Sequence, residues 1–211
     1  MKALSYFIII LFTPTLILLN YRFLVFNQNF YEKEYALLSV YQKFENRQLV
    51  NDQSSNLIKY LCCNKPLNTQ FYTQREILHL ADVKNLILLT NSLTIIFLST
   101  LILSSCYLLF KKQLKTLLKT YQAASIIAVA IIFILYLSSR INFSLFFTNF
   151  HYLSFRNDYW LLSEDSSLIK LFPQKFFADF ANRVAAQTFI CALIIDLFTY
   201  LNLKKHAFTK R

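Results

Sequence analysis

The stretch LILLTNSLTIIFLSTLILSSCYLLF, residues 86–110, decides the fold of this chain. It carries no charged side chain and is longer than the ~20 residues that a helix needs to cross about 30 Å of hydrocarbon. Inside lipid no water can satisfy the backbone N–H and C=O groups, so they must bond within the segment. The stretch is therefore predicted to be a transmembrane helix.

Three further apolar blocks approach or exceed the same length, at residues 3–26, 123–147 and 184–203. Hydrophobic residues make up 56% of the chain, whereas charged residues are only 16% and are clustered. Residues 1–211 are thus predicted to form a single all-α membrane domain with four transmembrane helices. The first block lacks a small-residue cleavage site, so we interpret it as an uncleaved helix rather than a signal peptide.

Basic residues flanking the apolar blocks predict the orientation of the chain. One acid-free cluster separates the second and third blocks and consists of Lys111, Lys112, Lys115 and Lys119. The tail carries Lys204, Lys205, Lys210 and Arg211, and Lys2 precedes the first block. Lys and Arg are retained on the cytoplasmic side, so both termini are expected there. Residues 27–85 and 148–183 then form a small extracytoplasmic cap.

The first outer segment contains two helical signals. Apolar side chains recur at helical spacing over residues 31–49, which predicts an amphipathic helix, and residues 51–70 are predicted to be loop. The run Thr73-Gln74-Arg75-Glu76 has the form of a capping box. A helix should begin there and continue without interruption through residue 110.

The second outer segment is dense in aromatic rings, which favour the headgroup level of a membrane. Pro173 suits the first turn of a helix, so residues 174–183 are expected to continue into the fourth span.

Composition excludes several functions. The chain contains no glycine, so it has no glycine-rich phosphate loop, dinucleotide fingerprint or Gly-x-Ser-x-Gly elbow. Its net charge of +11 lies largely in the two basic cytoplasmic segments, where topology and anionic lipid explain it without nucleic acid.

Two histidines are the candidates for chemistry. His79 and His151 belong to different outer segments, and each lies near the outer end of a span, whereas His206 belongs to the tail. Imidazole exchanges protons near neutrality, so the pair is suited to general acid and base catalysis. The alternative interpretation is two interfacial histidines with ordinary structural hydrogen bonds.

Nearby charges extend this candidate site. Asp82 follows His79 by three residues on the same predicted helix, where it could orient the imidazole or simply face water. Arg140 lies towards the outer end of the third span and is a candidate for binding a developing oxyanion. A metal site formed by His79, Asp82 and His151 is a further, weaker hypothesis.

Three motifs resemble the lipoprotein intramolecular transacylase family, Lit. They are HLADVK at residues 79–84, FHYLSFRNDYW at residues 150–160 and LIKLFPQKFF at residues 168–177. The four-span layout with two outer segments is also similar to that of the family. One departure is that residues 161–165 contain no proline, although the family has one soon after the tryptophan.

The resemblance implies a multi-pass acyltransferase of the Gram-positive cell membrane with its active site at the extracytoplasmic face. Its substrate would be a lipoprotein whose amino-terminal cysteine carries a diacylglyceryl group. The sn-2 acyl chain would move to the cysteine's own α-amino group, giving the lyso-form. The resemblance implies no cofactor or metal, and we expect a monomer in contact with membrane lipid. His79 and His151 match the catalytic histidines of the family. The expected substrate-binding residues are Asp82, Lys84, Arg140, Asn157 and Trp160.

Two alternatives stay open at this point. The same histidine pair would also serve a membrane lipid hydrolase or an intermolecular acyltransferase. A noncatalytic membrane protein, such as a sensor or an assembly partner, is the other alternative.

Overall fold

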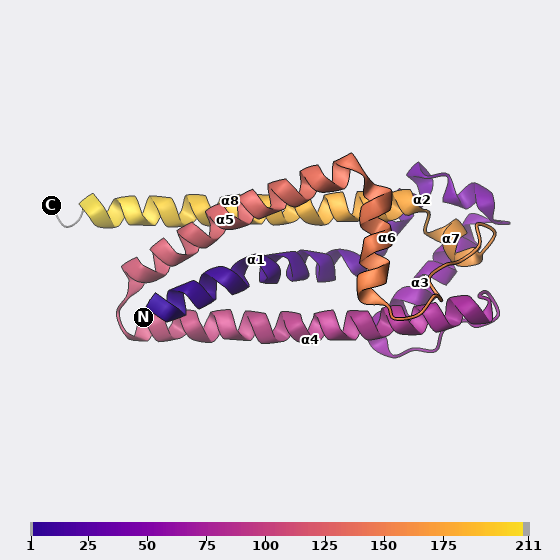
Figure 1. Ribbon diagram of the computed structural model, residues 1–211, viewed down its shortest axis with the longest axis horizontal. Helices are drawn as coiled ribbons and strands as arrows, with labels where there is room; N and C mark the ends of the chain where they lie inside the picture. Colours follow the sequence, from indigo (N-terminus) through magenta and orange to yellow (C-terminus); the bar gives the residue numbers. More distant parts are fainter. Residues whose placement is uncertain (1, 209–211) are drawn as a thin grey trace. The chain divides into compact units, whose positions relative to one another are not determined.

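The computed structural model describes residues 2–208, and the side chains of residues 2–205. Lys210, Arg211 and the side chain of His206 therefore lie outside the described residues. Every element in the described part is helical (Figure 1). In chain order the elements are α1 (Lys2–Val25), α2 (Gln28–Leu37), the 3-10 helix η1 (Val40–Lys43), α3 (Arg47–Cys63), α4 (Gln74–Phe110), α5 (Leu114–Ile141), α6 (Phe143–Ser154), α7 (Ser167–Leu171) and α8 (Gln174–Phe208).

Four of these helices are long and apolar enough to cross a membrane, namely α1, α4, α5 and α8. This confirms the predicted all-α fold with four transmembrane helices. Many of their large apolar side chains are exposed, for example Ile95, Phe133 and Ile194. Exposed apolar faces on long helices are expected where the neighbour is lipid rather than water.

The third span differs from its expected range, residues 123–147. Helix α5 begins earlier, at Leu114, and ends at Ile141. Asn142 then caps a separate helix, because its side-chain Oδ1 accepts a hydrogen bond from the backbone N–H of Leu145 at 3.0 Å. The apolar residues that follow, from Phe143 on, thus belong to α6, which carries His151.

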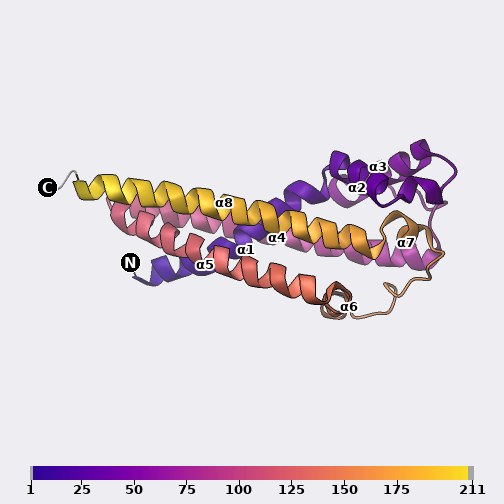
Figure 2. The same ribbon diagram turned by 90° about the horizontal axis from the view of Figure 1, so that it is seen from above.

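The chain divides into two compact units. The first contains the residues up to Tyr21, Asn91–Ser138 and the residues from Asn182 on. Within this unit the parts of α1, α4, α5 and α8 lie side by side (Figure 2). Phe12 of α1 packs against Ala124, Ala128 and Ala192 of α5 and α8. Small side chains at such contacts let the helix backbones approach closely.

The second unit contains Arg22–Thr90 and Ser139–Ala181 and includes every candidate site residue. Its first part corrects two expectations. A continuous helix over residues 31–49 was wrong, because α2 ends at Leu37 and Ser39 has a positive φ of 55°. The loop expected at residues 51–70 holds only for residues 64–70, because α3 extends to Cys63, which forms a disulfide with Cys62.

An aromatic core holds the second unit together. The ring of Tyr35 lies 6.0 Å from Phe172 and 6.1 Å from Phe176, measured between ring centroids. Tyr31 packs on the same two phenylalanines, and its hydroxyl donates to the backbone oxygen of Val25 at 2.7 Å. These contacts connect α2 to the region where α7 ends and α8 begins.

The start of α4 confirms the predicted capping box. The carboxylate of Glu76 accepts a hydrogen bond from the backbone N–H of Thr73 at 2.6 Å, and the Thr73 hydroxyl accepts from the N–H of Glu76 at 3.4 Å. The other carboxylate oxygen accepts from the N–H of Leu168, on α7, at 2.7 Å. Glu76 thus attaches the second outer segment to the first turn of α4.

Replacing Phe176 by alanine should destabilise the protein strongly, because its ring is 2% exposed within the aromatic core. We expect a loss of about 3–5 kcal/mol in the free energy of unfolding. Thermal unfolding of purified protein in detergent measures the change. The matched control is Phe198→Ala on the same helix, where the ring is 61% exposed. An equal loss in both variants would contradict the assignment of Phe176 to a core.

Candidate active site

Two imidazoles from distant parts of the sequence meet in the second unit. The ring centroids of His79, on α4, and His151, on α6, are 6.1 Å apart, with an angle of 32° between the ring planes. His79 is 7% exposed and His151 is 8% exposed. The structure thus brings together the two histidines that the sequence singled out.

The capping box sets the position of His79. Because it fixes the start of α4, Glu76, His79 and Asp82 follow one another at intervals of three residues along one face of the helix. His79 lies in the polar part of α4, residues 74–85, before the apolar stretch at residues 86–110. Its Nδ1 atom is buried and has no hydrogen-bond partner among the described residues.

Helix α6 fixes the tautomer of His151. The Nδ1 of its ring lies 2.7 Å from the backbone oxygen of Phe147, one turn earlier. A carbonyl oxygen only accepts, so this contact requires a proton on Nδ1. The Nε2 of the neutral ring therefore carries a lone pair, which is the arrangement that a general base requires.

Aromatic rings surround the pair. Phe155 touches both imidazoles, at centroid distances of 5.1 Å from His79 and 5.7 Å from His151. Phe147 lies 4.3 Å and Trp160 lies 4.9 Å from His151. These rings remove water from the imidazoles without offering them a counter-charge.

This environment opposes protonation. Burial, together with the neighbouring His151, lowers the pKa of the His79 imidazole from 6.5 to about 4, against a smaller opposite effect of Asp82. Burial also lowers the pKa of His151, and the hydrogen bond to Phe147 partly offsets that effect. Each ring protonates only as the pH falls through its lowered pKa, so both are neutral at pH 7.

Helix α4 also holds the loop that follows α6. The guanidinium of Arg75 donates to the backbone oxygen of Asp158, and the Nδ2 of Asn157 donates to Oδ2 of Asp82 at 2.9 Å. Asp82 thus bonds to this loop and forms no hydrogen bond with His79, so neither the imidazole-orienting contact nor a carboxylate that simply faces water is what the structure has. Trp160 belongs to the same loop, three residues after Asn157, and its ring packs on the His151 ring.

The second unit also contains a pocket of about 330 Å³, which we refer to as the Asp82 pocket. Its lining residues are Asp82, Asn85, Leu86, Leu89, Ser154, Phe155, Arg156 and Asn157. Phe155 belongs both to this pocket and to the aromatic surroundings of the histidines. Polar groups and apolar side chains therefore line one space, and one of its walls, Phe155, also touches both imidazoles.

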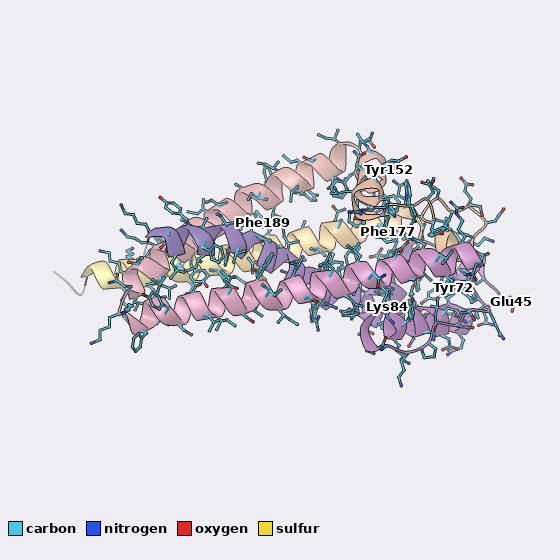
Figure 3. All side chains as sticks on the ribbon, turned by 60° about the horizontal axis from the view of Figure 1, so that its bottom comes forward. Glu45, Tyr72, Lys84, Tyr152, Phe177 and Phe189 are labelled. Atoms are coloured by element: carbon cyan, nitrogen blue, oxygen red, sulfur yellow. A yellow bond between two sulfur atoms is a disulfide. The ribbon has the colours of Figure 1, made fainter. Side chains whose placement is uncertain are left out.

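Two expected site residues are not brought to the histidines. The Nζ of Lys84 donates to the Asn64 side chain at 2.9 Å and lies 4.3 Å from the centre of the Tyr60 ring, so it faces α3. Figure 3 shows Lys84 on the side of α4 that borders α3. Arg140 is exposed at the end of α5 and forms no hydrogen bond or ion pair with any described residue.

Sequence reasoning missed the aromatic contacts of the pair, although a signal was present. Phe147, His151 and Phe155 are spaced four residues apart. Residues at this spacing lie on one side of a helix, and Phe155 is the residue directly after α6 ends. Arg156 was also missed, because nothing local indicates that it lines a pocket. Within residues 2–208, no group of three His, Cys, Asp or Glu side chains is placed to hold a metal ion.

Known proteins provide an independent comparison. The family model described as lipoprotein intramolecular transacylase Lit matches residues 6–177. A solved structure of the membrane-integral Lit from Bacillus cereus has a TM-score of 0.86 at 22% identity, covering 98% of this chain and 97% of that chain.

Two further Bacillus cereus Lit structures carry a single histidine replaced by arginine or by alanine. Both have a TM-score of 0.83, with identities of 20% and 21%. The matches cover 99% and 98% of this chain, and 94% and 95% of the solved chains. No curated protein sequence matches the chain.

Histidine-selective ¹⁵N NMR should reveal the neutral rings directly. At pH 7.5 we expect His151 to carry its proton on Nδ1, and between pH 7.5 and 6.5 neither His79 nor His151 should acquire a second proton. His79 should titrate near pH 4, because burial lowers its pKa. The variants His79→Gln and His151→Gln assign the signals. A titration of either ring at or above pH 6.5 would be incompatible with the described burial.

Proposed function

This chain belongs to the lipoprotein intramolecular transacylase Lit family of membrane acyltransferases, and from this premise we propose which group it moves and how. We propose that it transfers the sn-2 acyl chain of a diacylglyceryl-cysteine lipoprotein to the α-amino group of the same cysteine. The product is the lyso-form lipoprotein. The observation that supports this best is the pair of buried, neutral imidazoles 6.1 Å apart.

His151 is assigned the role of general base in this proposal. Its Nδ1–H is held by the Phe147 carbonyl, so Nε2 is available to accept a proton from the substrate. An α-ammonium group, with a pKa near ~8, must lose one proton before its nitrogen attacks an ester. That first proton passes to water. As the C–N bond forms, His151 accepts a second proton from the attacking nitrogen, and it gives this proton to the departing sn-2 oxygen of glycerol as the C–O ester bond breaks.

His79 is assigned the role of a neutral hydrogen-bond donor. Its lowered pKa disfavours the imidazolium form at pH 7, and its buried Nδ1 leaves Nε2 as the nitrogen for the substrate. An N–H on Nε2 would donate to the ester carbonyl oxygen as negative charge develops there. The two rings then have complementary functions, one accepting a proton and the other stabilising the oxyanion.

The proposal needs no enzyme nucleophile, because the attacking amine and the ester belong to one molecule. Holding them in contact supplies much of the acceleration that an intermolecular reaction would lack. Trp160 and the other rings around the pair contribute by excluding water, which would otherwise hydrolyse the ester. Arg140 is exposed, and the structure gives no support for the oxyanion role expected of it.

Expression in a bacterial host that makes only diacyl lipoproteins tests the reaction. Mass spectrometry of the amino-terminal lipopeptide should find one acyl chain in amide linkage and a glyceryl group that has lost one ester. Hydrolysis would instead release the chain as a free fatty acid, and a noncatalytic protein would leave the lipopeptide unchanged.

Substitutions separate the two roles. His151→Gln should reduce the rate by a factor of about 10² to 10⁴, the range for loss of general base catalysis. His79→Leu removes the N–H donor and should cost about 10² to 10³, the range for one oxyanion donor. Arg140→Gln and His206→Gln serve as controls and should stay within about threefold of the unchanged protein. A fully active His151→Gln variant would refute the mechanism.

We also propose that the site lies at the extracytoplasmic face, where mature lipoproteins are found. The turn between α4 and α5 exposes Lys111 and Lys112, and basic turns are retained in the cytoplasm. A green fluorescent protein joined to the carboxyl terminus should therefore fluoresce, and alkaline phosphatase joined there should be inactive. Phosphatase joined after Gln70 should be active. The opposite pattern would place the histidines in the cytoplasm and exclude the proposed substrate.

A further inference from the structure

The Asp82 pocket contains a carboxylate that lacks a cationic partner. Asp82 is half-buried, and its Oδ2 accepts a hydrogen bond from Asn157. Asp82 forms no ion pair with a described Lys, Arg or His side chain, unlike Asp179, which pairs with Lys175. Lys84, the lysine nearest to Asp82 in sequence, is directed to Asn64 and Tyr60 on α3. The Oδ1 atom of Asp82 is thus free to accept hydrogen bonds from a cation.

The same pocket contains a guanidinium. Arg156 lines it and is exposed, yet it forms no ion pair with Asp82. A pocket that contains a carboxylate and a guanidinium that are not paired with each other suits a ligand that has a positive group and a carbonyl oxygen close together. The amino-terminal residue of a peptide has this arrangement, with its ammonium two bonds from its carbonyl carbon.

We propose that the Asp82 pocket binds the free amino-terminal cysteine residue of the lipoprotein, with Asp82 accepting from its α-ammonium and Arg156 donating to its carbonyl oxygen. This inference rests on the proposed function and names the part of the substrate that the pocket recognises. Charge-assisted hydrogen bonds of both kinds are stronger than neutral ones.

The position of the pocket fits this role. Asp82 is one helical turn from His79, and Phe155 forms a wall of the pocket while touching both imidazoles. An amine held at Asp82 therefore lies one helical turn from His79, in a pocket whose Phe155 wall also touches His151, the ring proposed to remove its proton. Leu86 and Leu89 line the pocket where the apolar stretch of α4 begins, so the lipid part of the same ligand has apolar surface beside it.

Acyl transfer would also weaken binding at this position. The ammonium is positively charged before the reaction, whereas the amide formed from it carries no charge. Asp82 consequently loses its cationic partner once the amide exists, and the product should dissociate more readily than the substrate. The pocket thereby distinguishes substrate from product by charge.

Binding of unreactive analogues tests the inference without requiring turnover. The probe is a fluorescent peptide whose amino-terminal cysteine carries a dialkylglyceryl group, because its ether linkages cannot transfer an acyl chain. One version has a free amine and the other is N-acetylated. Fluorescence anisotropy measures the Kd of each version with purified protein in detergent at pH 7.

The unchanged protein should bind the free-amine probe about tenfold more tightly than the acetylated one, the factor for one charge-assisted hydrogen bond. Asp82→Asn keeps an oxygen for Asn157 but removes the charge, so this preference should fall to within about twofold. Arg156→Gln should weaken both probes to the same extent, because both retain the carbonyl. Asp52→Asn, an equal charge change at an exposed site on α3, is the matched control and should keep the preference.

The outcomes separate this inference from the proposed function. Binding of both probes without a preference, or a preference that survives Asp82→Asn, would overturn the role of Asp82 while leaving the substrate class intact. Failure of the unchanged protein to bind either probe would overturn both. If Asp82→Asn does not fold, the preference of the unchanged protein and the equal weakening in Arg156→Gln still decide the result.

Discussion

The buried carboxylate of Glu76 is the contact on which the site depends. It is 0% exposed, and its two oxygens accept backbone N–H groups from different segments. One bond closes the first turn of α4, and the other fastens the start of α7. A buried carboxylate is tolerable only when such donors compensate its desolvation. Because the bonds are directional, the first fixes the register of His79 on α4, and the second holds the segment that follows Trp160 against that helix.

Aromatic burial then determines the chemical character of the histidines. Phe147, Phe155 and Trp160 surround His151, and Phe155 also covers His79. Such rings raise the cost of a charged imidazole, so both rings are kept neutral near pH 7. A neutral imidazole can accept a proton on one nitrogen and donate from the other. The Asp82 pocket, which shares Phe155 with the histidines, contains a carboxylate and a guanidinium.

Much of the fold and the histidine pair of the candidate site were predictable from the sequence, for different reasons. Four long apolar stretches leave the chain no alternative to helices in lipid, and the capping box at Thr73 fixed the start of α4. The break at Asn142 and helix α3 were not predicted, because a capping asparagine and buried polar residues such as Gln53 resemble loop signals. His79 and His151 were identified as a pair, whereas Lys84, expected to bind substrate, contacts α3 and Arg140 is exposed without a hydrogen bond to a described residue.

The sequence by itself determined the transmembrane helices, the exclusion of nucleotide and glycine-loop chemistry, and the two histidines. These conclusions depend on local properties, namely the length of apolar runs and the types of residues present. Only the tertiary structure decided that the two rings approach within 6.1 Å, that His151 donates to Phe147, and that Asp82 bonds to Asn157. The first and the third of these contacts join residues that are 72 and 75 positions apart, and the second depends on the rotamer of His151. A local pattern of side chains encodes neither a distant pairing nor a rotamer.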